Sequence, residues 1–213
     1  MTRAIGDLIS TCFYEGKLNS PSNVSLHGYE SIAKPVLWLD TSNYGARRFE
    51  EVDTMSKGSY FNRLEAQILS EHLESFDRAI DIGFVKLPTG AASLSVLLIA
   101  PYRSQLDAIK REIARWSPKY LEISVESIDA VQGKESDLAF LTVTRNNKRG
   151  SLGFIGHDYW RRINVALSRA RLGLTIIGDA QFCGRLPGPL ADVLDYMSTH
   201  PKDCEVRTVD ANK

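Results

Sequence analysis

The sequence lacks the features that mark secreted, metal-binding and membrane proteins. Its three cysteines, Cys12, Cys183 and Cys204, are scattered along 213 residues and form no Cys-x-x-Cys pair, which disfavours both a disulfide framework and a zinc site. No apolar run reaches the ~18 residues of a membrane span. The N-terminus lacks the basic start and apolar run of a signal peptide. These absences predict an intracellular protein, cytoplasmic or nuclear, with no metal ligands of its own and no membrane partner.

Neither sign of charge is in excess. The 26 basic residues balance the 26 acidic ones, so no overall field favours nucleic acid, and any such contact must come from a local patch. Apolar residues make up 43% of the chain, enough for a substantial core. The length suits one domain. We expect residues 1–200 to form that domain, and residues 201–213 to follow as a C-terminal tail that frays.

A third absence concerns phosphate binding. A P-loop requires the pattern G-x-x-x-x-G-K-[ST], but the only two Gly-Lys pairs, at Gly16 and Gly133, are followed by Leu and Glu. No strand-like segment ends in the acidic pair that holds Mg²⁺ in P-loop enzymes. These 213 residues therefore lack half of a nucleotide-hydrolysing site.

Strand-like and helix-like segments alternate along the chain. Several of the strand-like segments are near-continuous apolar runs, as expected for strands covered on both faces of a parallel sheet. The alternation predicts an α/β fold with a doubly wound, mainly parallel sheet. Ser59 and Asp158 are the expected N-caps of two helices. The expected strands are 36–40, 95–102, 121–129, 138–145 and 173–179, and the expected helices are 59–76, 103–116, 160–171 and 189–198.

Polar residues follow four of the expected strands. In open sheets of this kind, ligands bind beyond the carboxyl ends of the strands. The segments that follow the second to fifth strands are PYRSQ, AVQGKE, RNNKRG and DAQFC. We therefore expect polar, phosphate-compatible side chains to gather at one edge of the sheet.

Within AVQGKE, three residues suit a ligand. Gly133 can adopt a positive φ or let the backbone approach a ligand closely. Lys134 offers a point charge, and Glu135 offers an acceptor suited to a ribose hydroxyl. An ordinary surface turn is the alternative interpretation.

The segment WRRINVALSRAR places arginines in an apolar helical pattern. Arg162 falls in the expected first turn, where the helix dipole disfavours a cation by up to about 1 kcal/mol, and an anionic partner would relieve that conflict. Arg162 and Arg169 are seven residues apart and share one face. Arg169 has small neighbours and suits bidentate phosphate recognition. The alternative for both arginines is an internal salt bridge to Asp or Glu.

The segment PYRSQ combines Tyr102, Arg103 and Gln105 at a strand end. An aromatic ring beside an arginine can stack a nucleobase and hold a phosphate. A turn that starts the next helix explains the same residues equally well.

Taken in this order, the segments resemble the C-terminal RecA-like domain of superfamily 1 helicases, in the up-frameshift, Dna2 and senataxin-like branch. VLLIAPYRSQ looks like motif IV, SIDAVQGKESDLAFLTVTR like motif V, and RRINVALSRARLGLTIIGD like motif VI. AIGDLISTCFYEGKL is similar to the segment after that family's Arg-Met-His-Pro motif, and SYFNRLEAQIL to its linking helix. The resemblance covers Ala4 to about Asp179 and implies a RecA-like, P-loop-NTPase-type sheet with helices on both faces.

The resemblance also implies a mechanism in which two RecA-like domains clamp ATP between them. The first domain brings the P-loop and the acids that bind Mg²⁺, and the second brings an arginine finger, here Arg169. The implied ATP-binding residues are Gly133, Lys134, Glu135, Arg162 and Arg169. The implied contacts with single-stranded DNA or RNA are Tyr102, Arg103, Gln105 and Ser127.

The chain departs from the family pattern in three ways. It opens with Met-Thr-Arg where the Arg-Met-His-Pro element should end, Lys134 stands where arginine is common, and Ser168 stands where threonine is usual. The implied function is the second motor domain of an ATP-dependent DNA or RNA helicase. Such a domain is inactive in isolation and needs a P-loop domain from the same parent chain or from a separate one. A stand-alone module that binds nucleic acid or protein without ATP turnover is the alternative, and the presence of Glu135 and Arg169 argues against it.

Overall fold

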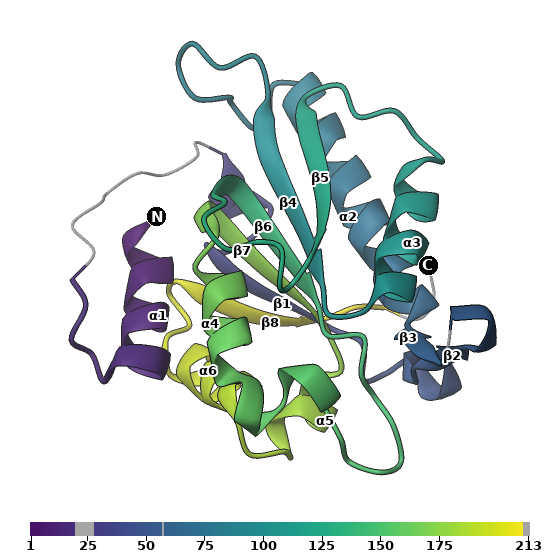
Figure 1. Cartoon of the computed structure of the whole chain (residues 1–213). Helices are drawn as coiled ribbons and strands as arrows, with labels where there is room; N and C mark the ends of the chain where they lie inside the picture. The colour runs from purple at the N-terminus through teal and green to yellow at the C-terminus, as the bar shows by residue number, and fades with distance from the viewer. Residues whose placement is uncertain (20–27, 57, 211–213) are drawn as a thin grey trace.

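The structure, a computed structural model, describes residues 1–19, 28–56 and 58–210. Its centre is a six-stranded sheet in the order β5-β4-β6-β7-β1-β8, with every neighbouring pair parallel (Figure 1). The strands are β1 (Val36–Asp40), β4 (Leu94–Ala100), β5 (Leu121–Ser127), β6 (Ser136–Thr142), β7 (Ala170–Gly178) and β8 (Cys204–Thr208). A separate antiparallel hairpin joins β2 (Glu51–Asp53) to β3 (Ser59–Phe61).

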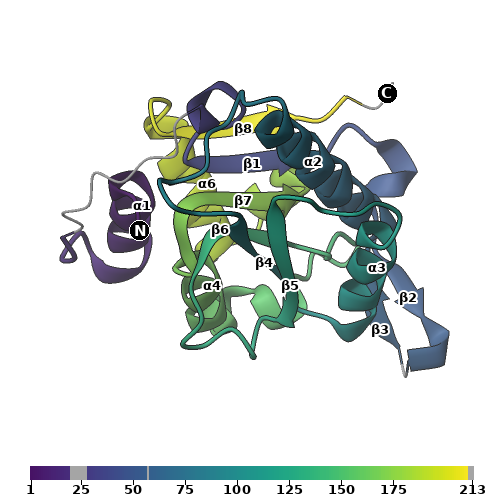
Figure 2. The ribbon, with the colours of Figure 1, turned by 90° about the horizontal axis from the view of Figure 1, so that it is seen from above.

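Helices cover both faces of the sheet (Figure 2). One face packs on the long helix α2 (Arg63–Asp81) and on α3 (Arg103–Ile113). The other face packs on α1 (Arg3–Tyr14), α4 (Trp160–Leu167), the short α5 (Ala180–Gly184) and α6 (Pro189–Thr199). In the part of the chain that the structure describes, no helix has the length and apolarity needed to cross a bilayer.

The apolar runs explain the central strands. All five residues of β1 are buried, and each of β4, β6 and β7 has a single residue that is not. Strands that lie between two helix layers have no solvent face, so they do not alternate between apolar and polar residues. The predicted doubly wound α/β sheet is confirmed, and each of the five expected strands is present.

Helix boundaries differ from the expectations for local reasons. Asn62, rather than Ser59, caps α2, because its Oδ1 accepts a hydrogen bond from the backbone N–H of Glu65 at 3.1 Å. The backbone of Tyr159, rather than Asp158, precedes α4, and no side chain caps that helix. The expected helix 160–171 ends at Leu167, because the chain from Ala170 onward pairs with β6.

The C-terminal segment differs most from the expectation. The sequence predicts a tail outside the domain at residues 201–213, yet Cys204–Thr208 form β8, which pairs along all of β1. Residues 211–213 of the predicted tail lie outside the described residues. The burial pattern of β8 explains the difference, because only Cys204 is fully buried and the strand carries no apolar run. An edge strand of mixed polarity gives a weak sequence signal.

Gly173 supports a test of how tightly the sheet packs. A Cβ atom at this position would lie 2.4 Å from the Oη atom of the buried Tyr29 and 2.9 Å from Cδ2 of Leu138. We therefore expect Gly173→Ala to lower the free energy of unfolding by about 1–3 kcal/mol, the usual cost of overpacking. Urea denaturation measures this change.

Gly184→Ala is the matched control, because its Cβ would meet only Leu194 Cδ1 at an ordinary 3.6 Å. We expect the control to unfold at the same urea concentration as the parent chain or slightly above it. An equal loss in both variants would contradict the tight contact at Gly173.

Candidate nucleotide site and nucleic-acid interface

The predicted site residues divide between the two edges of the sheet. Gly133, Lys134 and Glu135 directly precede β6, and Arg169 directly precedes β7, so all four lie at the edge where the strands begin, here called the amino edge. PYRSQ, RNNKRG and DAQFC lie at the opposite, carboxyl edge. The expectation of a single edge was wrong, because residues 128–135 cross the whole sheet between the end of β5 and the start of β6.

Arg169 lies at the amino edge without a carboxylate partner among the described residues. Its Nε donates to the carbonyl oxygen of Val165 at 2.8 Å, and one terminal nitrogen donates to Oγ of Ser168 at 2.8 Å. The other terminal nitrogen donates to the carbonyl oxygen of Lys134 at 2.9 Å, at an exposed position. The guanidinium is therefore half-buried, oriented by neutral oxygens, and keeps its full positive charge.

Strand pairing holds motif-like residues of two segments together at this edge. The backbone N–H of Ser136 donates to the carbonyl oxygen of Arg169 at 3.0 Å, at the first pair of the β6–β7 ladder. Glu135 is exposed beside this pair, and no contact of its carboxylate is found within the described residues. Gly133 has φ +79°, and a Cβ there would meet nothing within 4 Å. Open space, a cation and a free carboxylate thus adjoin one another.

The other two predicted nucleotide ligands have partners. The ammonium of Lys134 pairs with the carboxylate of Glu126. Arg162 Nε lies 2.8 Å from Oδ1 of Asp129, in the crossover after β5. Arg162 therefore has the internal ion pair that was the alternative interpretation, and the structure does not bring it to Arg169.

The carboxyl edge, where α/β sheets usually bind ligands, is filled by the protein's own polar side chains. Asp40 ends β1 and accepts hydrogen bonds from the backbone N–H groups of Ser42 and Ala180 at 3.0 and 2.9 Å. Asp179 follows β7 and accepts from Nδ2 of Asn146 at 2.7 Å. Both aspartates are buried. The carboxylates of Asp40 and Asp179 therefore hold the protein's own groups and are not open to a ligand.

A buried ion pair and a buried carboxyl group complete this network. Arg145 Nε lies 2.8 Å from Oε2 of Glu50, with both side chains about one-tenth exposed or less. The carboxyl of Glu65, 1% exposed, accepts a hydrogen bond at 2.7 Å from the backbone N–H of Thr144, which has the left-handed φ of +69°. Sequence analysis missed both groups. The signal was a single glutamate in the otherwise apolar stripe of α2.

A family model described as AAA domain matches residues 1–181. This chain belongs to that family. Its resemblance to the C-terminal RecA-like domain of superfamily 1 helicases is thereby confirmed, and the sheet described above is that RecA-like fold.

Relatives of the AAA domain carry helicase and nucleic-acid names. The DNA-binding protein SMUBP-2 of Rattus norvegicus is 30% identical over 98% of this chain and 20% of its own length. A regulator of nonsense transcripts 1 homolog of Arabidopsis thaliana is 29% identical over 96% of this chain and 15% of its own. The DNA replication ATP-dependent helicase/nuclease DNA2 of Mus musculus is 32% identical over 77% of this chain and 14% of its own length. The chain thus spans about a fifth or less of these relatives.

Among solved structures, the C-terminal domain of a possible DNA helicase from a Lactobacillus aligns with 90% of this AAA domain. The TM-score is 0.48 and the identity 13%, so this likeness adds nothing to the family match.

The motif IV residues of the AAA domain occupy very different environments. Gln105 is fully buried. Its Oε1 accepts a hydrogen bond from the backbone N–H of Asn62 at 2.6 Å, and its Nε2 donates to the backbone carbonyl oxygen of Asn62 at 3.2 Å. The predicted nucleic-acid contact of Gln105 is therefore not supported. Tyr102 is 6% exposed, and its Oη accepts a hydrogen bond from Arg145 at 3.0 Å. Arg103 is exposed, and Ser127 is half-buried at the end of β5.

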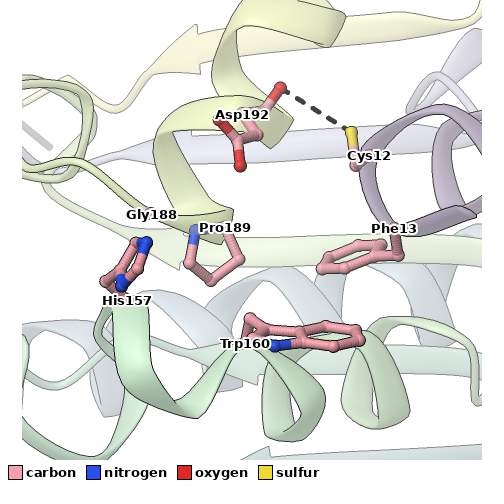
Figure 3. A pocket seen from close by; sticks show the side chains of 7 residues that line it. All are labelled: Cys12, Phe13, His157, Trp160, Gly188, Pro189 and Asp192. Atoms are coloured by element: carbon pink, nitrogen blue, oxygen red, sulfur yellow. Dashed lines mark hydrogen bonds between the residues drawn. The ribbon is translucent and has the colours of Figure 1, made fainter. Parts of the chain in front are cut away.

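A pocket among the helices on the α1, α4 and α6 face of the sheet does not suit a nucleotide (Figure 3). It lies between α1, α4 and α6, where the rings of Phe13 and Trp160 stack with centroids 6.5 Å apart. None of its lining residues is a lysine or arginine, and Asp192 contributes a negative charge that opposes a triphosphate. Burial raises the pKa of the Cys12 thiol in this pocket to about 12, which keeps it protonated and unreactive at neutral pH.

Glu65 gives the AAA domain a pH-dependent stability. Burial raises the pKa of this carboxyl well above its ordinary 4.5, although the bond from Thr144 opposes the rise. The folded state therefore binds the proton more tightly than the unfolded chain does. The stabilisation is complete below pH 4.5 and declines as pH rises towards the folded-state pKa. We expect Glu65→Gln, which keeps the acceptor for Thr144, to remove this decline.

The measurement is urea unfolding of both chains at a series of pH values above 4.5. Glu71→Gln is the control, because Glu71 is exposed on the same helix. A pH dependence that survives in Glu65→Gln and equals that of the control would contradict the assignment to Glu65.

Proposed function

We propose that this chain is the second motor domain of an ATP-dependent nucleic-acid helicase. In this proposal Arg169 is the arginine finger that completes a nucleotide site on a P-loop domain. One observation carries the proposal: a half-exposed guanidinium with no carboxylate partner in the described part of the chain lies against the backbone that bears Glu135. The names of the relatives support it, because one of them is an ATP-dependent helicase.

The amino edge fits one side of a bound triphosphate. Arg169 would stabilise the charge that develops on the transferred phosphoryl group, which is how such arginines act. Glu135 has free acceptors for a ribose hydroxyl, and Gly133 leaves room for the sugar beside it. Mg²⁺ and the P-loop would come from the first RecA-like domain, which supplies the metal-assisted part of the chemistry. In this scheme Lys134 contributes its backbone carbonyl, because its ammonium is paired with Glu126.

Arg162 has a supporting role in this scheme. Its ion pair with Asp129 ties the start of α4 to the crossover whose far end carries Glu135. Arg162 would thus hold motif V and motif VI in a fixed relation, rather than touch the nucleotide itself.

The first prediction concerns the isolated chain. Because half of the nucleotide contacts belong to another domain, we expect the purified 213-residue chain to hydrolyse no ATP above the rate of buffer alone, with or without single-stranded DNA or RNA. Release of inorganic phosphate from radiolabelled ATP measures this rate. Turnover that co-purifies with the chain and changes in Arg169→Ala would contradict a half-site.

The second prediction concerns a reconstituted site. We expect a P-loop-containing first RecA-like domain of a superfamily 1 helicase, joined to this chain, to show ATPase activity stimulated by nucleic acid. Arg169→Ala should lower the stimulated kcat by roughly 10³–10⁵-fold, the usual value of an arginine finger. Arg169→Lys should restore little, because an ammonium lacks the planar, bidentate donor set.

Arg171→Ala is the matched control. Arg171 lies in β7, two residues after Arg169, and is exposed. Its Nη1 is 3.8 Å from Oδ1 of Asp137. We expect this control to keep the stimulated kcat within a few-fold of the parent. Equal losses in both variants would show a general charge effect instead of a finger. Absence of stimulated activity in any pairing, with nucleic-acid binding retained, would favour the stand-alone binding module.

A further inference from the structure

A ladder of aromatic rings at the carboxyl edge ends in an exposed phenylalanine. The ring of Tyr60 meets that of Tyr102 edge-on with centroids 5.3 Å apart, and Tyr102 lies 5.5 Å from Phe154. Phe154, in the short 3-10 helix η4 (Gly153–Ile155), in turn meets Tyr159 at 6.1 Å. Tyr102 is buried, whereas Phe154 is 49% exposed. The exposed ring of Phe154 therefore packs on the buried ring of Tyr102.

Cations fix the orientation of this ring. The guanidinium carbon of Arg162 lies 5.5 Å from the centroid of Phe154 and 4.8 Å from that of Tyr159, while Asp129 holds its Nε. Gly153 has φ +57°, and a Cβ there would lie 2.5 Å from Tyr102 Oη and 3.0 Å from a terminal nitrogen of Arg145. Only a glycine lets this turn approach Tyr102 so closely. Phe154 is thus held in place despite its exposure.

A pocket of about 390 Å³ opens beside the ring, with Phe154, Tyr60 and Arg103 in its lining. Arg103 is exposed, and none of the described residues offers it a carboxylate within ion-pair distance. Ser56 and Ser59 also line the pocket. The nearby carboxylate of Asp53 is already engaged by Ser104 Oγ at 2.8 Å. The pocket thus combines an aromatic surface with an exposed cation that has no carboxylate partner among the described residues.

We propose that Phe154 and Arg103 bind one nucleotide of a single strand, with the base stacked on Phe154 and the phosphate on Arg103. A flat apolar ring beside an unpaired guanidinium is the combination that sequence-tolerant single-strand sites use. Balanced net charge makes such a local cation necessary. Exposed Lys148 and Arg149, in the connection that leads to Phe154, add positive charge for the neighbouring phosphates. This inference rests on the nucleic-acid part of the proposed function and transfers the stacking role from Tyr102 to Phe154.

The first test is binding of the full 213-residue chain to fluorescein-labelled oligothymidylate or oligouridylate of about 12 nucleotides, followed by fluorescence anisotropy at low salt. Base–aromatic stacking is worth about 5–150-fold in affinity. We expect Phe154→Ala to raise Kd by at least about tenfold within this range, and Phe154→Tyr to stay close to the parent. Phe84→Ala is the matched control, because Phe84 is 52% exposed and lies in the loop after α2. Circular dichroism checks that each variant is folded.

Arg103→Gln tests the phosphate contact. We expect it to raise Kd and to reduce the slope of log Kd against log salt concentration by about 1, the value for one phosphate contact. Arg111→Gln, also exposed and also in α3, should leave that slope unchanged.

The second test does not depend on affinity. Oligonucleotides that carry 5-iodouracil are bound to the chain and irradiated so that they crosslink to it. The crosslinked chain is then digested with trypsin. We expect the crosslink on the peptide from Gly150 to Arg161, at Phe154. A crosslink confined to other peptides, absence of binding at low salt, or equal Kd values for Phe154→Ala and Phe84→Ala would overturn the proposal.

These outcomes are separable from those of the motor assay. If Arg169→Ala abolishes ATPase activity while Phe154→Ala binds normally, the stacking site is wrong and the motor stands. If Phe154 crosslinks and its loss weakens binding, but no P-loop domain gives stimulated turnover, the stacking site stands without the motor.

Discussion

The pairing of β6 with β7 is the constraint on which the candidate nucleotide site depends. The two strands begin at Ser136 and Ala170, and the residues just before them, Glu135 and Arg169, are adjacent because the ladder starts there. The backbone of Arg169 accepts from Ser136, and its side chain donates to the carbonyl of Lys134. Motif V and motif VI are therefore joined by the backbone ladder, which depends little on side-chain identity, and by one further bond that needs the guanidinium of Arg169.

The buried carboxylates at the ends of β1 and β7 hold the carboxyl edge together. At the carboxyl edge, Asp40, Asp179 and Glu65 use their oxygens to hold backbone N–H groups, and the Glu50–Arg145 pair closes the space between them. Such a network is costly to open, because each member leaves an unpaired buried group when a partner is removed. It fixes the loops on which the aromatic ladder is built. The interior of the carboxyl edge thus supports the exposed Phe154 and Arg103 above it, whereas at the amino edge the charges of Glu135 and Arg169 lie directly beside the strands.

Much of this arrangement follows from the sequence, and the exceptions have physical causes. The strands β1, β4, β6 and β7 could be read from their residues, because burial on both faces demands continuous apolar runs. The resemblance to helicase motifs indicated Arg169 and Glu135. The edge on which they lie could not be read, since a crossover as short as residues 128–135 gives no sign of its direction. Tyr102 and Gln105 carry side chains that often contact ligands, yet tertiary packing buries both. Nothing in the local sequence marks Phe154, because the ring of Tyr102, on which it packs, comes from a distant segment.

The parallel direction of the strands has a consequence for how the two ends of the domain communicate. The seven residues of β6 separate Glu135 from the loop that leads to Phe154, a span of roughly 23 Å at the usual rise per residue. A strand hydrogen-bonded on both sides within a close-packed core neither stretches nor bends by useful amounts. Movement imposed at one end is therefore carried to the other as rotation or translation of the entire body, in the manner of a stiff lever.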